Sequence, residues 1–111
     1  MADADNKVEQ AAPTKPGLTV PLTKDIEAHG EKISSLFFRE PTGADIANVG
    51  FPLKFDFTTD PPGVDLHEQK MEAMMVRLAA IPPSSVRLLS TRDWATCAWR
   101  VAGFFMPNGP I

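Results

Sequence analysis

The apolar residues of this chain change their spacing once, near residue 65, and that change limits the folds open to it. Before this point they alternate with polar residues, at Leu18–Leu22 and again at Phe51–Phe57. After it they recur three or four residues apart, at Met71, Met74, Met75 and Leu78. A two-residue period is typical of strands and a period near 3.6 of helices. The order predicts an α+β fold, with strands first and helices afterwards.

The first half predicts an N-terminal antiparallel hairpin. Gly17–Thr23 and Ile33–Arg39 are the expected strands, and Lys24–Lys32 is expected to be a polar turn with Gly30 at positive φ. Apolar residues fall on both faces of the second strand, so either both faces are covered or a bulge shifts the register. The alternating segment Phe51–Val64 is either a third strand, placed at an edge by its proline, or an insertion.

The stretch between strands and helices, Arg39 to Asp45, combines a charged pair, a proline, a hydroxyl, a glycine and a carboxylate. Pro41 cannot pair in a ladder and ends the strand. Thr42 followed three residues later by Asp45 predicts a capping box and a short helix closed by Gly50. One glycine without a following lysine excludes a phosphate-binding loop. We therefore assign a structural role to Arg39, Glu40, Pro41, Thr42 and Asp45.

The second half predicts about three helices packed on one face of the hairpin. Asp65 with Glu68 is the expected capping pair of the first helix, which runs to the break at Pro82–Ser85. A short helix follows the break. Ser90 and Asp93 repeat the capping pattern before the last helix, which ends near Phe105.

The chain of 111 residues is expected to form one domain. Residues 1–16 are polar and rich in charge, which predicts a disordered tail. The single α+β domain is expected to span 17–106, and the breaker-rich residues 107–111 are expected to fray. The acidic start differs from a secretory signal, and the apolar runs are too short to cross a bilayer, which predicts a cytoplasmic protein.

Charge and composition argue against several function classes. Eleven basic residues stand against fourteen acidic ones, a net charge of −3 without a basic field for nucleic acid or a membrane surface. The single Cys97 excludes an internal disulfide and is expected to be buried. His29 and His67 are too far apart in sequence to suggest a metal site. We expect no enzyme, no cofactor and no metal.

What remains is apolar surface for binding. Three methionines within five positions form a soft face of the kind that grips varied apolar partners, and the last helix carries more aromatic side chains than one small helix needs to bury. Packing in the core is the competing interpretation for all of them. The candidate partner-binding residues are Met71, Met74, Met75, Leu78, Trp99 and Phe105.

The order of these parts resembles the tail assembly chaperone family of Mu-like and P2-like contractile-tailed phages. The resemblance lies in the corner "LFFREPTGAD", the later "IPPS" and "LSTRDW", and the closing Val101-x-x-Phe104. Together these features extend over roughly residues 18–105.

The resemblance implies a non-enzymatic protein of phage or prophage origin, working in the cytoplasm of the bacterial host. Such proteins bind and solubilise the tape measure protein before the tail tube polymerises. A longer frameshifted form can recruit tail tube subunits, and self-association is left open. The alternatives are a structural tail component retained in the particle and a small cytoplasmic protein-binding adaptor.

Overall fold

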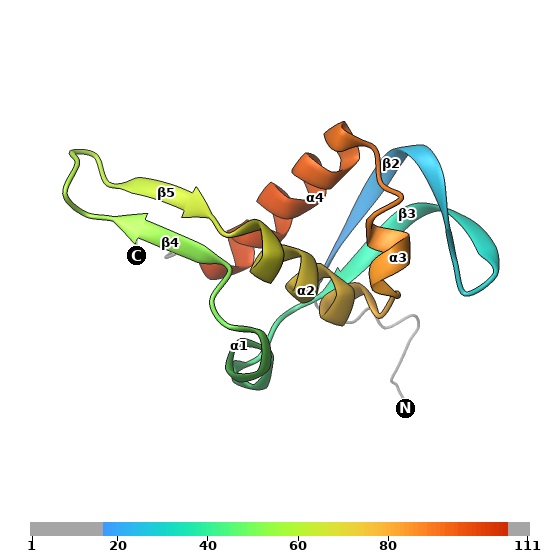
Figure 1. The fold of residues 1–111 in the computed structure, drawn as a ribbon, viewed down its shortest axis with the longest axis horizontal. Coiled ribbons are helices and arrows are strands. Elements are labelled where there is room, and N and C mark those ends of the chain that lie inside the picture. Colours follow the sequence, from blue (N-terminus) through green and yellow to red (C-terminus); the bar gives the residue numbers. More distant parts are fainter. Residues whose placement is uncertain (1–16, 107–111) are drawn as a thin grey trace, which may run out of the picture.

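The computed structural model describes residues 17–106, so the predicted tail at 1–16 and the predicted frayed end at 107–111 lie outside the described residues. Strands lead and helices follow, as the change in spacing predicts, and the α+β class is confirmed. Figure 1 shows a twisted hairpin of β2 and β3 beside the helices, and a second, short hairpin of β4 and β5 that extends from them.

The first hairpin joins β2 (Gly17–Ala28) to β3 (Glu31–Arg39) in antiparallel register. Its turn is only His29–Gly30, and both residues have positive φ, 53° and 77°. This geometry matches a two-residue hairpin loop, so the expected positive φ of Gly30 is confirmed. The longer turn predicted at Lys24–Lys32 is wrong, because Ile26 and Ala28 are buried and extend the strand.

A bulge interrupts β2 in its middle. Pro21 pairs with Ser35, yet the next paired residue of β2 is Ile26, opposite Ile33. Several residues of β2 therefore face a single residue of β3, which frees their backbone N–H groups from the ladder. The register shift foreseen from the imperfect alternation of β3 is present, on the partner strand.

The corner folds as predicted. Thr42 is the N-cap of α1 (Gly43–Val49), and the carboxylate of Asp45 accepts the backbone N–H of Thr42 at 2.8 Å. Gly50 closes the helix with φ 100° and donates its N–H to the Ile46 carbonyl at 2.7 Å. A residue with a side chain is strained at that φ, so the glycine is required there.

The alternating segment pairs locally. β4 (Leu53–Asp56) and β5 (Gly63–Leu66) form their own antiparallel sheet, so the option of a third strand added to the first hairpin is wrong. The predicted capping pair at Asp65 is also wrong, because Asp65 lies in β5 opposite Lys54. His67 is the N-cap of α2 instead, and its ring Nδ1 accepts the backbone N–H of Lys70 at 3.3 Å.

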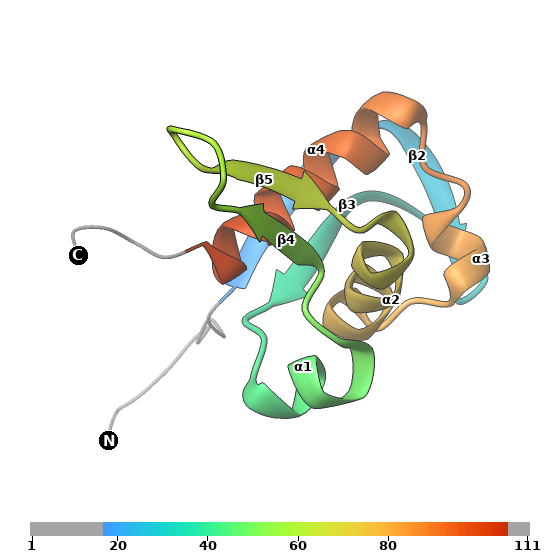
Figure 2. The same cartoon turned by 60° about the vertical axis from the view of Figure 1, so that its left-hand side comes forward.

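The remaining helices are α2 (Glu68–Ala79), α3 (Pro83–Val86), α4 (Thr91–Ala102) and the 3-10 turn η2 (Gly103–Phe105). Helix α2 packs against β3 and α4 against β2. Figure 2 shows α2 and α3 in front of the first hairpin. The Ser85 hydroxyl donates to the Glu27 carbonyl at 2.7 Å and ties α3 to the end of β2. The core lies between this hairpin and these helices.

Candidate functional site

The methionine-rich face of α2 lies inside the molecule. Met71, Met74 and Met75 have no exposed surface and Leu78 has 3%, and they belong to one core cluster with Val20. Burying a side chain of this size contributes about 1.5–3 kcal/mol to folding. The face therefore holds α2 in the core, and contact of these residues with a partner stays a prediction.

The other two predicted partner residues differ from each other. Phe105 is 8% exposed and packs at the end of η2, whereas Trp99 on α4 is 50% exposed. Other large apolar side chains at the surface, missed as candidates in the sequence, are Phe37, Ile46, Phe51, Phe57 and Leu88.

Aromatic rings form a continuous row along the second hairpin. The ring centroids of Phe57 and Phe55 are 6.0 Å apart and stacked, and those of Phe55 and Phe51 are 6.2 Å apart. Phe51 meets Phe105 edge to face at 5.4 Å. The row arises because residues two apart in an extended segment point to the same side. We call the β4–β5 hairpin with Phe51, Phe55 and Phe57 the aromatic arm.

The arm carries an open apolar groove. Phe55, Phe57, Pro62, Val64 and Met106 line a hollow of about 340 Å³ whose walls are almost entirely apolar. Phe57, at the outer end of the row, is 77% exposed. Aromatic and methionine side chains open to water in this way are typical of a protein-binding surface.

The base of the arm is fixed although its tip is open. Pro52 and Leu53 are buried, and the backbone N–H of His67 donates to the Pro52 carbonyl at 2.8 Å. Phe51 leans on Phe105 of η2. The groove is therefore anchored between a core-packed end and a free tip.

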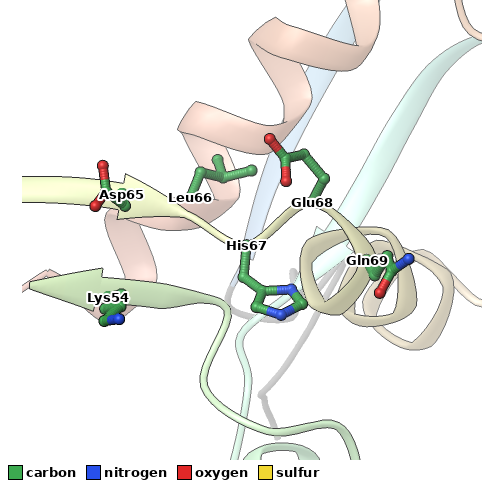
Figure 3. Close-up of a pocket in the computed structure, with 6 residues that line it drawn as sticks. All are labelled: Lys54, Asp65, Leu66, His67, Glu68 and Gln69. Atoms are coloured by element: carbon green, nitrogen blue, oxygen red, sulfur yellow. The ribbon is translucent and has the colours of Figure 1, made fainter.

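The polar side of the arm also has a hollow, at the start of α2, but its side chains do not converge (Figure 3). Asp65 and Glu68 point to one side of the chain and His67 points to the other. The His67 ring is already engaged as a helix cap. Among residues 17–106, no group of three or more His, Cys, Asp or Glu side chains is arranged to hold a metal ion.

Asp45 is the most strongly engaged carboxylate of the described part. It is 1% exposed and accepts two hydrogen bonds from the Arg39 guanidinium, at 2.7 and 2.8 Å, and one from Arg77 Nε at 2.9 Å. The bonds from Arg39, helped by those from Thr42 and Arg77, hold the pKa of Asp45 well below its usual range although burial opposes this. Asp45 ties the end of β3, α1 and α2 together.

Asp93 occupies the bulge of β2. Its carboxylate accepts the backbone N–H groups of Thr23 at 2.9 Å and Lys24 at 3.2 Å, and the Thr23 hydroxyl at 3.0 Å. Burial disfavours the charged form, but these hydrogen bonds outweigh it and the pKa of Asp93 is lowered. The predicted cap at Ser90 is confirmed, since its hydroxyl accepts the Asp93 N–H at 3.2 Å. The role of the Asp93 side chain was missed, because it bonds 70 residues away.

Cys97 is fully buried on α4, as predicted. Burial, with the nearby Asp93 charge, raises the pKa of its thiol to about 11. The nucleophilic thiolate is therefore scarce at neutral pH. Within residues 17–106, no helix is both long and apolar enough to cross a membrane.

The comparisons with known proteins agree with this order of parts. The model of a family described as "Phage tail assembly chaperone proteins, E, or 41 or 14" matches residues 19–106. The matched range contains the corner, both hairpins except the first two residues of β2, and every helix from α1 to η2. No curated protein and no solved structure matches the chain.

Proposed function

This chain belongs to the phage tail assembly chaperone family, and we propose that it binds the tape measure protein and keeps it soluble until the tail tube polymerises around it. The aromatic arm is the observation that carries this proposal. A long helix with an apolar stripe aggregates unless the stripe is covered. The arm offers three aromatic rings outside the core on an acidic chain of net charge −3.

The arm suits temporary holding better than permanent packing. Its rings meet side chains of many shapes because stacking and edge contacts tolerate several geometries. Its groove is open to solvent, so a bound segment can leave without unfolding the arm. A chaperone that departs before the tail is complete needs this kind of contact.

The residues predicted to bind the partner take different parts in this proposal. Trp99 contributes directly, since half of its surface is open. Met71, Met74, Met75 and Leu78 support the site from within by fixing α2, and Phe105 supports it by packing beneath Phe51.

We further propose that the chain acts without catalysis, in the cytoplasm of the bacterial host. Asp45 and Asp93 are held by structural hydrogen bonds, His67 caps a helix and Cys97 is buried. Recruitment of tail tube subunits by a longer frameshifted form, and self-association, belong to the same proposal.

Co-expression with the tape measure protein of the same phage tests the function. The amount of tape measure protein in the soluble fraction is measured with and without this chain. A tagged copy is then captured from host cells during tail assembly, and finished particles are probed for it by mass spectrometry. We expect a soluble complex in the cells and no chain in the particles.

Two results would contradict the proposal. A tape measure protein that is equally soluble without this chain needs no such chaperone. Detection of this chain in finished tails, at the level of other tail subunits, identifies a structural component instead.

A further inference from the structure

We infer that the groove of the aromatic arm receives an amphipathic α-helix whose apolar stripe is flanked by lysine or arginine. This inference rests on the proposed function and names the chemistry of the tape measure segment that the arm selects. It follows from the spacing of the rings, the hydrogen-bonding capacity of the arm, and its charges.

The spacing of the rings along the row matches the spacing of side chains along one face of an α-helix. Its two steps, from Phe57 to Phe55 and from Phe55 to Phe51, measure 6.0 and 6.2 Å between centroids. The Cβ atoms of residues three or four positions apart on a helix are about 5–6 Å from each other. A helix lying along the row therefore places one apolar side chain per turn against the rings, and about two turns cover the arm.

A helix fits this surface better than an added strand does. β4 and β5 have four residues each, and Pro61 and Pro62, just before β5, have no N–H to donate. An extended segment lying on the rings would bury unpaired backbone N–H and C=O groups, which is costly. A helix satisfies its own backbone hydrogen bonds and presents only side chains.

The arm carries an excess of negative charge. Between Leu53 and Leu66 it carries the carboxylates of Asp56, Asp60 and Asp65 against the single ammonium of Lys54. Asp65 lies directly opposite Lys54 in the hairpin register, which leaves Asp56 and Asp60 near the tip uncompensated on the arm. Complementary charge favours a helix with basic residues beside its stripe and disfavours an acidic one.

A second copy of this chain is the competing occupant. Helix α4 also combines an exposed apolar side chain with basic ones, at Trp99, Arg92 and Arg100. Its exposed part offers one large apolar side chain, Trp99, whereas the ring row has room for a stripe repeated over successive turns. The row therefore favours a long, regularly striped helix.

The test uses three fluorescent peptides of roughly 20 residues, long enough to form a helix. Two share an apolar stripe with flanks of lysine in one and glutamate in the other, and the third has lysines with a scrambled stripe. Binding to the full chain is measured by fluorescence anisotropy. The lysine-flanked striped peptide is expected to bind most tightly, and added salt to weaken its binding.

Substitutions connect the binding to the arm. Phe57→Asp is expected to weaken binding of the lysine-flanked striped peptide by about tenfold or more, as for a central aromatic contact. The matched control Leu88→Asp changes a side chain of similar exposure elsewhere, 54%, and should leave binding unchanged. Asp56→Asn combined with Asp60→Asn removes the two uncompensated charges near the tip and should reduce the preference for lysine over glutamate flanks.

Three results would overturn the inference. They are equal binding by the Phe57→Asp variant, equal affinity for lysine and glutamate flanks, and self-association of the wild-type chain that Phe57→Asp and Trp99→Asp each abolish. The proposed function is judged separately, by solubility of the tape measure protein with the wild-type chain. A chain that solubilises it while Phe57→Asp remains fully active keeps the function and loses this site.

Discussion

The two hairpins of this protein share one pattern of alternating residues but differ in what covers them. In the first, Val20, Leu36 and Phe38 are buried beneath α2 and α4. In the second, Phe55 is partly open and Phe57 is 77% exposed. The strands also differ in length, twelve and nine residues against four and four. Because its apolar face is buried, the first hairpin forms part of the core. The second leaves its rings partly open and is therefore a candidate for binding.

The largest effect is expected when charge is introduced into the buried face of α2 that covers the first hairpin. Met74→Asp combined with Met75→Asp places two carboxylates at positions without exposed surface, so the chain should fail to fold. Circular dichroism and proton NMR dispersion measure this directly. Phe57→Asp on the arm is the matched control and should fold normally.

A folded double aspartate variant that no longer solubilises the tape measure protein would reverse this interpretation. It would show that the methionine face opens and contacts the partner, as the sequence first suggested. Met75→Leu serves as the conservative control, because volume-conserving apolar exchanges cost less than about 1.5 kcal/mol.

Removing a carboxylate charge should cost more stability at the corner than on the aromatic arm. Asp45→Asn removes the charge that Arg39 and Arg77 share, with an expected loss of roughly 1.5–3 kcal/mol in the free energy of unfolding. The lower end is favoured, because the two arginine side chains are 40% and 39% exposed and water screens the pair. Urea unfolding measures the loss. Asp65→Asn on the arm should stay within about 0.5 kcal/mol, and a loss as large as that of Asp45→Asn would contradict the comparison.

Acid should destabilise the fold mainly through its two buried carboxylates, Asp45 and Asp93. The pKa values of Asp45 and Asp93 are lower in the folded chain than in the unfolded one. Their stabilising effect is therefore complete above the unfolded carboxyl pKa, about 4, and is lost progressively as the pH falls from there through the lower pKa values of the folded chain. Melting temperatures between about pH 7 and about pH 2 should drop steeply below about pH 4. Asp45→Asn should flatten this drop, and an unchanged slope would exclude Asp45 as its source.

Local chemistry explains which parts the sequence could predict. The capping box at the corner, the Gly50 cap and the Ser90 cap each depend on contacts between residues at most four positions apart. The local sequence is therefore enough to predict them. Helix α2 started later than expected because Asp65 pairs across β4 with Lys54, a tertiary preference that overrides a capping pattern. Tertiary contacts over 32 and 70 residues, Arg77 to Asp45 and Asp93 to Thr23, leave no local signal.

The candidate site was harder to predict for the same reason. Periodicity identifies an apolar face but does not say what covers it. The methionine face and the phenylalanine row are equally regular in sequence. The methionines face the first hairpin and the phenylalanines do not, which only the packing of distant segments decides.

A small gain should come from the end of α2. Ala80 closes the helix in the left-handed region with φ 56°, where a Cβ atom is unfavourable. Ala80→Gly should stabilise the chain by about 0.5–1 kcal/mol, the relief of strain exceeding the added freedom of the unfolded chain. Urea unfolding again measures it. A loss of stability would show that the strain is absorbed elsewhere, for instance by the contact of the His29 ring with the Ala80 carbonyl at 3.0 Å.

The smallest effect on stability is expected where the effect on binding is largest. Phe57→Ala removes a ring that is 77% exposed, so the free energy of unfolding should change by less than about 0.5 kcal/mol. Phe38→Ala on the covered hairpin removes a fully buried ring and should cost about 3–5 kcal/mol. Urea unfolding of both variants, followed by peptide binding of the Phe57 variant, separates the two roles. Equal losses of stability would mean that the arm is part of the core, and a conformation in which Phe57 is covered would then have to replace the open one.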